Sequence, residues 1–321
     1  MTHIEKDEYE LIKTYLLNDS PLQGKYKPKL WIHSNVEVNA RDWKTNMFRN
    51  SRDLAQPYLS LTIQSIINFC GDDFHVCLID DNSFAKLIPK WDIDMSTTSE
   101  PMKTYVREIG ILSLLYYYGG MRVPDSFLCL KPLYPLYQSC LGVGVNASSD
   151  KIAPFLVENV GRHTTPLGCK AEQFSPTLEM MGVLKNSPVI KEWLNHLKEK
   201  IKDGHISEEM LITGEIRRLG IDYMEVGRAM RVDGRFVGVK DNAQNPIGIE
   251  KLLGTSYLDV TDSDLYGIWI PREDAMRRTK YKWFSIMSEE ELLQSSLIIA
   301  KYFKLSMVRV AETAHLDIDL A

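Results

Sequence analysis

Residues 116–133 read Tyr116-Tyr117-Tyr118-Gly119-Gly120-Met121-Arg122-Val123-Pro124-Asp125-Ser126-Phe127-Leu128-Cys129-Leu130-Lys131-Pro132-Leu133, and no other stretch indicates the fold class as clearly. It begins as the end of a helix. The glycine pair at 119–120 stops that helix, because glycine accepts backbone angles that other residues avoid. A short apolar strand follows at 121–123, before a polar interruption at 124–126. A helix that passes through a glycine turn into a buried strand is typical of an α/β protein.

The sequence before this stretch alternates apolar runs with amphipathic segments. Residues 29–33 and 75–79 are short apolar runs typical of buried strands, and the second run ends in two aspartates. Residues 58–69 and 107–118 carry apolar side chains at helical spacing. Strand, helix and strand in this order predict a right-handed parallel crossover, and so a Rossmann-like sheet over residues 29–135.

The remaining segments predict further elements of both kinds. We expect a packing helix at 5–17, a strand at 141–145, a strand at 174–185, helices at 188–200 and 207–219, a hairpin or tight turn at 233–234, a strand at 265–271, and a capping box at 288–291 that begins a helix over 292–303. No internal repeat, low-complexity tract or linker interrupts this pattern. The sequence therefore predicts one continuous α/β domain.

The composition excludes several classes of protein. The chain has 321 residues and a net charge of −5, so no global positive field favours nucleic acid and we expect no nucleic-acid partner. Its five cysteines lack the spacing of a zinc or redox site, which suits free thiols in a reducing compartment. No apolar segment reaches the roughly 20 residues of a membrane span. We expect a soluble, cytoplasmic protein with no membrane span.

The stretch quoted first resembles the donor-site segment of GT-A glycosyltransferases that carry a DXD sugar-binding motif, a group that includes capsular polysaccharide synthesis enzymes and Golgi mannosyltransferases. In that group a helix ends in Tyr-Gly-Gly, a strand delivers Asp-X-Asp to a metal and a nucleotide-sugar, and a segment like Leu-Lys-Pro-Leu follows. Here the Asp-X-Asp positions are Pro124, Asp125 and Ser126, so one carboxylate stands at the variable position. The resemblance extends over residues 29 to about 200. It implies a GT-A-like, mostly parallel Rossmann-type sheet flanked by helices.

The resemblance also implies a function. The expected activity is transfer of a sugar from a nucleoside diphosphate donor to a glycan, a lipid-linked sugar or a protein. The alternative is a catalytically silent GT-A-like protein with a binding or structural role. We expect an N-terminal packing helix within 1–28, a nucleotide-sugar-binding half at 29–135, and an acceptor-side half with C-terminal helices at 136–321. Golgi members of the group carry an amino-terminal membrane anchor, and the sequence shows none. This absence indicates a cytosolic enzyme, a protein of a virus that replicates in the cytoplasm, or a shortened form of an anchored enzyme.

Two expectations concern the diphosphate of the donor. A divalent cation, Mn²⁺ or Mg²⁺, held at Asp125 is the first, because hard cations prefer oxygen ligands. Asp81 and His33, at the ends of two predicted strands, are candidates for the same donor site; otherwise Asp81 caps a loop and His33 is a core histidine. Metal-independent transfer is the second expectation, with arginines binding the diphosphate in bidentate fashion. The candidates are Arg41, Arg49 and Arg52, which otherwise pair with neighbouring aspartates.

The remaining candidates lie close to the motif or on the acceptor side. In the resembled group an acid on the helix before Tyr-Gly-Gly helps to bind the nucleotide, and Glu108 takes that position here. Otherwise Glu108 is a solvated acid near the helix start. The further donor-site candidates are Gly119, Gly120, Arg122 and Ser126, and the two glycines also serve as the helix stop. Glu179 falls where the group places polar acceptor-side residues, so Glu179 and Asp125 are the catalytic candidates; otherwise Glu179 is a polar residue at a strand edge.

Overall fold

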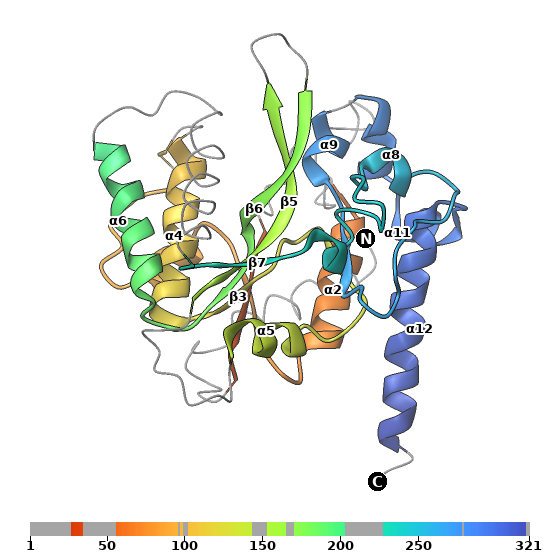
Figure 1. Ribbon diagram of the computed structural model, residues 1–321, viewed down its shortest axis with the longest axis horizontal. Coiled ribbons are helices and arrows are strands. Elements are labelled where there is room, and N and C mark those ends of the chain that lie inside the picture. The colour runs from red at the N-terminus through yellow and green to blue at the C-terminus, as the bar shows by residue number, and fades with distance from the viewer. Residues whose placement is uncertain are drawn as a thin grey trace.

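The computed structural model shows an α/β protein whose central sheet carries helices on both faces (Figure 1). It describes residues 27–34, 56–95, 97–98, 102–142, 153–164, 170–202, 227–277 and 279–318. The predicted fold class is confirmed. The predicted division of the chain at residues 28 and 135 stays a prediction.

The central sheet contains six strands in the order β2-β1-β3-β6-β5-β7. These strands are β1 (Lys29–His33), β2 (His75–Ile79), β3 (Gly120–Arg122), β5 (Phe155–Thr164), β6 (Lys170–Val183) and β7 (Met230–Val232). β1 pairs in parallel with β2 and β3, and β5 pairs in parallel with β7, whereas β6 is antiparallel to both of its neighbours. The sheet is therefore mostly parallel, and the predicted parallel crossover between β1 and β2 is confirmed.

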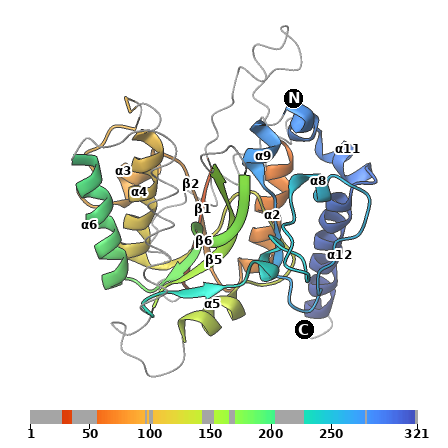
Figure 2. The ribbon, with the colours of Figure 1, turned by 45° about the horizontal axis from the view of Figure 1, so that its top comes forward.

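The helices and a second, two-stranded sheet surround this core. The α-helices are α2 (Tyr58–Cys70), α3 (Ser83–Leu87), α4 (Met102–Tyr118), α5 (Tyr134–Leu141), α6 (Pro188–Lys202), α8 (Ile249–Leu252), α9 (Arg272–Arg277), α10 (Lys282–Ser285), α11 (Glu289–Gln294) and α12 (Ile298–Ile318). The 3₁₀ helices are η2 (Gly234–Val237) and η3 (Thr279–Tyr281), and the small sheet pairs β4 (Phe127–Cys129) with β8 (Gly267–Trp269). Figure 2 shows α3, α4 and α6 on one side of the central sheet, and α2, α9 and α12 on the other.

Strand β1 explains why its sequence reads as a continuous apolar run. Trp31 packs into the core formed with α4 and α6, whereas Leu30 and Ile32 pack into the core formed with α2 and α5. All three side chains are buried. Because β1 lies inside a sheet covered on both faces, successive residues must all be apolar.

The glycine pair connects α4 to β3 through a conformation that needs glycine. Gly119 has a φ of 67° and Gly120 a φ of 104°. A Cβ atom on Gly120 would overlap the carbonyl oxygen of Lys29, so this position allows β3 to approach β1 closely. The carbonyl of Gly119 accepts a hydrogen bond of 2.9 Å from Trp31 Nε1. The predicted helix stop is thus confirmed.

The C-terminal part packs on α2 through a third apolar core. This core joins Tyr58 and Leu59 to β4, β8, α8, α10, α11 and α12. The predicted capping box is confirmed, because Ser288 Oγ accepts from Glu291 N and the Glu291 carboxylate accepts from Ser288 N. The single helix predicted over 292–303 is wrong. The chain takes an extended conformation at Ser295, and α12 begins three residues later.

One further prediction needs correction, and another is confirmed in one of its alternatives. Leu141 ends α5 and Gly142 caps it in the left-handed conformation, so the predicted strand at 141–145 does not begin there; residues 143–145 lie outside the described residues. Asp233 caps the 3₁₀ helix η2 by accepting from Arg235 N at 2.9 Å, so of the two alternatives predicted at 233–234 the tight turn is confirmed and the hairpin is not formed. The helices predicted at 5–17 and 207–219 also lie outside the described residues. Among the helices that the structure describes, none has the length and apolar character needed to cross a bilayer.

Candidate functional site

Polar side chains gather where the parallel strands β1, β2 and β3 end. His33 and Ser34 lie at the carboxyl end of β1, Asp81 follows β2, and Asp125 follows β3. Because the three strands are parallel, these ends share one edge of the sheet, where α/β folds bind their ligands. The structure thus brings together three sequence-predicted site residues: His33, Asp81 and Asp125.

Asp81 is held by two basic side chains. Arg107, from α4, donates from Nε to Asp81 Oδ1 at 2.9 Å and from Nη2 to Asp81 Oδ2 at 2.8 Å. His33 Nε2 lies 3.0 Å from Asp81 Oδ1. Burial by itself would raise the pKa of Asp81, but the hydrogen bonds from His33 and Arg107 outweigh it and hold the pKa well below its usual range. Asp81 is therefore an anion at neutral pH, and the guanidinium of Arg107 compensates its negative charge.

Asp80, one residue earlier, has a structural role. Its Oδ1 accepts from Ser83 N at 2.9 Å and from Ser83 Oγ at 2.6 Å. These contacts fix the turn that leads into α3. The alternative that an aspartate here caps a loop therefore applies to Asp80, whereas Asp81 faces the basic side chains at the sheet edge.

Glu108 and Arg122 form a second ion pair. Arg122 Nη1 donates to Glu108 Oε2 at 2.7 Å, and Arg122 Nη2 donates to Glu108 Oε1 at 3.0 Å. Arg122 Nη1 also donates to the carbonyl of Leu178 at 3.1 Å. Both side chains are largely buried. Glu108 is thus a buried partner of Arg122 and not a solvated acid.

Asp125 is the centre of a third network, which joins β3 to α2 and α9. Arg272 Nη1 donates to Asp125 Oδ2 at 2.7 Å, and Ser34 Oγ donates to the same oxygen at 3.2 Å. Thr62 Oγ1 donates to the main-chain carbonyl of Asp125 at 2.5 Å. The Asp125 side chain is only 7% exposed. Its carboxylate is buried, ion-paired with Arg272 and hydrogen-bonded by Ser34, and Thr62 holds its main chain.

The network continues from Arg272 into α2. Arg272 Nε donates to Gln56 Oε1 at 3.2 Å, and the Tyr58 hydroxyl donates to that oxygen at 3.0 Å. Gln56 and Tyr58 are both buried. Desolvation by burial raises the pKa of Tyr58 above its usual range, so its hydroxyl stays a donor. The guanidinium of Arg272 is therefore held between a buried carboxylate and a buried amide.

Ser126 and the glycine pair do not contribute side chains to this edge. Ser126 is buried, and its hydroxyl donates to the carbonyl of Ile270 at 3.0 Å, which joins the loop after β3 to β8. Gly119 and Gly120 lie at the opposite, amino end of β3, where Gly119 is close to the backbone of Lys185 and Gly120 to that of Lys29. Contacts of these three residues with a sugar donor, as predicted, do not fit this placement. Ser126 is hydrogen-bonded to Ile270, and the two glycines pack against neighbouring backbone.

The strand β6 has an irregular register beside the site. Leu156 of β5 pairs with Met181, whereas the next residue, Val157, pairs with Thr177. Residues 178–180 of β6 therefore lie between two consecutive pairs of the ladder. Such a bulge changes the direction of side chains and is common beside functional sites.

The bulge presents Glu179 to solvent. Leu178 and Met180 are buried on opposite faces of the sheet, whereas residues two apart in a regular strand share one face. Glu179 lies between them and is exposed. Met181 pairs with Arg122 across the β3–β6 ladder, so the bulge is adjacent to the end of β3 and to Asp125.

Glu179 is ionisable near neutral pH. The residue as a whole is exposed, but protein surrounds its carboxyl group, and this desolvation is the main cause that raises the pKa. The charges of Glu273, Glu108 and Asp125 act in the same direction, and Arg122 acts against them. Together these effects raise the pKa of Glu179 to about 7. A carboxyl group with this pKa can accept a proton at neutral pH.

The described residues do not form a cation site. They contain no group of three or more His, Cys, Asp or Glu side chains arranged to hold a metal ion. Asp125, the predicted metal ligand, is bound by Arg272 and Ser34. The predicted Mn²⁺ or Mg²⁺ site does not fit this donor set. Arg41, Arg49 and Arg52, predicted to bind a diphosphate, lie outside the described residues.

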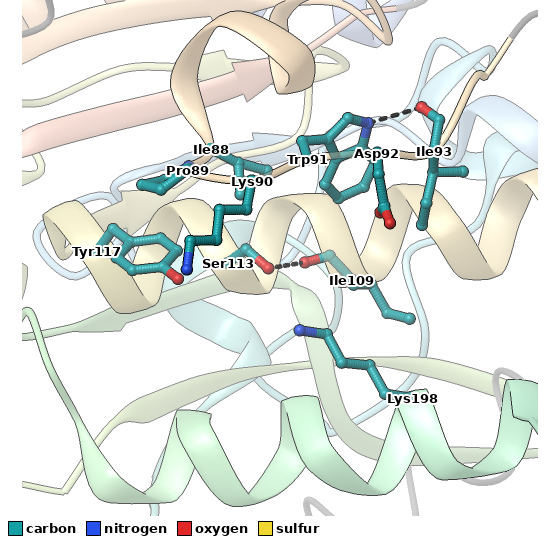
Figure 3. Close-up of a pocket in the computed structure, with 10 residues that line it drawn as sticks. All are labelled: Ile88, Pro89, Lys90, Trp91, Asp92, Ile93, Ile109, Ser113, Tyr117 and Lys198. Atoms are coloured by element: carbon teal, nitrogen blue, oxygen red, sulfur yellow. Dashed lines mark hydrogen bonds between the residues drawn. The ribbon is translucent and has the colours of Figure 1, made fainter.

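A small cavity lies away from this edge. It has a volume of about 90 Å³ and lies between residues 88–93, α4 and α6 (Figure 3). Trp91, Lys90 and Lys198 are among its lining residues, and none of the residues described above lines it. Ligand pockets commonly have volumes of roughly 300–1,000 Å³, so this cavity is too small for a nucleotide-sugar.

Sequence reasoning missed Arg272 and its partners Gln56 and Tyr58. The antiparallel pairing of Phe127 with Trp269 sets Asp125, before β4, next to Arg272, after β8. The signal in the sequence is that a charged residue, Arg272, directly follows the apolar strand predicted at 265–271, where strand ends carry site residues. The sequence does not reveal which strand this segment pairs with.

Comparisons with known proteins add little. No known protein family matches the sequence, and no curated protein matches it. A solved structure, "PaToxG Glycosyltransferase", is similar with 12% sequence identity and a TM-score of 0.32, over 94% of this chain and 94% of that chain. At these values the similarity carries no argument about the function of this chain.

Proposed function

We propose that this protein is a glycosyltransferase that moves a sugar from a nucleoside diphosphate donor to a hydroxyl group of a glycan, a lipid-linked sugar or a protein. The observation that carries the proposal is the position of Glu179. A bulge presents this carboxyl group, with its pKa of about 7, beside the Asp125–Arg272 pair at the edge where α/β sheets bind nucleotides. The pairing of a base with an anion-binding edge suits transfer from a diphosphate donor.

The proposed reaction uses Glu179 as the general base. Glu179 takes the proton of the acceptor hydroxyl while that oxygen attacks the anomeric carbon of the donor sugar. The bond from this carbon to the diphosphate oxygen breaks, and the electron pair leaves with the nucleoside diphosphate. Because attack and departure occur on opposite faces of the sugar, we expect inversion at the anomeric carbon. A cytoplasmic setting is part of the proposal, as the four described cysteines are free thiols.

One observation favours a second candidate function. The carboxylates of Asp81, Glu108 and Asp125 all form ion pairs within the protein. A GT-A-like protein in which such pairs only stabilise the fold would be catalytically silent and would act in binding or as a structural component.

Donor binding and donor hydrolysis distinguish the two candidates. Calorimetry of the full chain with UDP-, GDP- and CMP-sugars, each with and without Mn²⁺, measures binding. Proton NMR of the released sugar then gives the rate and the anomer, with water as the acceptor. We expect one of the nucleoside diphosphate sugars to bind and to yield the inverted sugar, and we expect no binding of the CMP-sugars, which carry a single phosphate. Glu179→Gln should lower the rate by about 100-fold or more and leave donor affinity unchanged, because the base contacts the acceptor.

The control is Glu199→Gln, which removes an exposed carboxylate of α6. This variant should keep the wild-type rate and affinity. An unchanged rate in Glu179→Gln would exclude Glu179 as the base. If none of the donors binds under either condition, the silent alternative holds.

A further inference from the structure

Three arginines lie near the carboxyl edge of the sheet, and they use their donors differently. Arg107 and Arg122 each hold a carboxylate through two guanidinium nitrogens, on Asp81 and Glu108. Their side chains are 16% and 11% exposed. Arg272 contacts its carboxylate through Nη1 alone, and its side chain is 32% exposed.

The guanidinium of Arg272 keeps donors for a ligand. Nη1 is used on Asp125 and Nε on Gln56, whereas Nη2 has no acceptor among the described residues. An arginine presents five N–H donors in a rigid fork that matches the oxygens of a phosphate. About a third of the Arg272 side chain is exposed, so the side chain is open to solvent.

Buried neighbours fix the orientation of this fork. Asp125 and Gln56 are themselves held by Ser34 and Tyr58, and all four residues are buried. An arginine oriented in this way loses little side-chain entropy when it binds an anion. The free donors are therefore oriented before a ligand arrives.

The loop after β3 offers little else for a diphosphate. Pro124 has no side-chain donor or acceptor, and the hydroxyl of Ser126 is used on β8. The one carboxylate of the loop, Asp125, already neutralises part of the charge on Arg272. A fixed guanidinium can stabilise the negative charge that develops on a leaving diphosphate, as a metal ion does in other sites.

We propose that Arg272 binds the diphosphate of the donor in place of a divalent cation, and that Asp125 and Gln56 are the positioning residues that orient it. This inference rests on the proposed glycosyltransferase function and adds its donor-binding residue. The inference distinguishes two roles of Asp125, as a residue that positions Arg272 and as a metal ligand. If Asp125 only positions Arg272, its charge competes with the diphosphate. If Asp125 binds a metal, its charge is required.

Calorimetric titration of the full chain with UDP, GDP and inorganic pyrophosphate, in EDTA and in Mn²⁺, tests the inference. We expect metal-free binding of one nucleoside diphosphate that weakens as the salt concentration rises. Arg272→Gln should weaken this binding by about 10- to 100-fold, because a hydrogen-bonded charge is lost. Arg272→Lys should bind the nucleotide more tightly than Arg272→Gln and more weakly than the wild type, because lysine keeps the positive charge but lacks the forked donors of a guanidinium. Asp125→Asn should bind metal-free nucleotide as tightly as the wild type or more tightly.

The control for charge is Arg228→Gln, which removes an exposed arginine paired with Glu192. It should bind like the wild type. Thermal denaturation of each variant verifies folding, and Arg272→Lys keeps the test decisive if Arg272→Gln or Asp125→Asn does not fold.

Two results would overturn the inference. If binding requires Mn²⁺, is lost in Asp125→Asn and is unchanged in Arg272→Gln and Arg272→Lys, Asp125 is a metal ligand; the glycosyltransferase proposal then survives without this inference. If neither nucleotide nor pyrophosphate binds under any condition, both proposals fail.

Discussion

Asp125 and Glu179 lie near each other, but their surroundings give the two carboxyl groups different properties. Asp125 is buried and bound by Arg272 and Ser34, so its position is fixed. Glu179 is exposed at a bulge and has a pKa of about 7. At the scale of single residues, environment decides which carboxylate orients a neighbour and which one exchanges a proton.

The pKa of Glu179 predicts how the stability of the protein depends on pH. A folded pKa of about 7 is higher than the roughly 4.3 of an unfolded glutamate, so the folded state binds more protons between these values. The contribution of Glu179 to the free energy of unfolding therefore falls as the pH rises from about 4.5 to about 7. Glu179→Gln cannot lose a proton and so removes this loss. The free energy of unfolding of the variant, relative to that of the wild type, should therefore be higher at pH 8 than at pH 5. The gain should stay below about 1 kcal/mol, because solvent screens an exposed group.

Urea denaturation of the wild type and Glu179→Gln at both pH values measures this difference. Glu199→Gln, in α6, controls for the loss of one exposed carboxyl group. If the stabilities of Glu179→Gln and the wild type differ by the same amount at pH 5 and at pH 8, the pKa of Glu179 is not raised.

At the scale of elements, two local irregularities place the site. The turn at Gly119 and Gly120 lets α4 end where β3 begins, and it sets β3 against β1. The bulge at 178–180 then adds three residues to β6 opposite one step of β5. Without the first, β3 would not carry Asp125 to the sheet edge, and without the second, Glu179 would point into one of the two cores.

The two glycines 120 and 142 provide a matched test of the close approach. Both have positive φ, but a Cβ at Gly120 would overlap the backbone of Lys29, whereas a Cβ at Gly142 meets nothing within 4 Å. Gly142→Ala should cost only the strain of the left-handed conformation, about 1–2 kcal/mol. Gly120→Ala should cost at least about 3 kcal/mol, because β1 and β3 must move apart. Chemical denaturation of both variants measures the costs, and equal costs would mean that strand approach does not limit position 120.

At the scale of the whole molecule, a buried ion pair joins the sheet to the C-terminal half. Glu158 of β5 accepts from Lys240 Nζ at 2.7 Å and from the backbone N of Gly234 at 3.0 Å. The side chains of Lys240 and Glu158 are 6% and 4% exposed. Removing either member leaves the other buried charge with a longer ion-pair contact only, because Lys240 Nζ lies 3.4 Å from Asp233 Oδ1 and Glu158 Oε1 lies 3.4 Å from Arg231 Nη1.

This pair predicts strong coupling between two distant segments. Glu158→Gln and Lys240→Met should each destabilise the protein by about 3 kcal/mol, and the double variant by clearly less than the sum. Urea denaturation of the four proteins measures the coupling energy. Additive losses would mean that the two charges do not depend on each other. The salt bridge between Arg228 and Glu192, exposed on the surface, should show coupling of at most about 1 kcal/mol in the same cycle.

The fold class and the first half of the sheet follow from the sequence. β1, α2, β2, α4 and β3 all lie where apolar runs and helical spacing predict them, because each depends on contacts within a few residues or on burial of one continuous run. The carboxyl-edge positions of His33, Asp81 and Asp125 follow from the same order of elements. Local signals fail at Ser295, where the single predicted helix is divided into α11 and α12. Both segments have helical spacing, so periodicity does not reveal the break between them.

The partners of these site residues were decided by tertiary structure. Arg272 lies 147 positions after Asp125 and reaches it through two three-residue strands, β4 and β8, whose pairing carries no local signal. The raised pKa of Glu179 likewise needs a bulge and charges from three other segments. Local periodicity is a property of neighbouring residues, so it predicts elements and strand ends. Ion pairs and proton affinities depend on which distant segments share one desolvated region, and only the folded chain defines that.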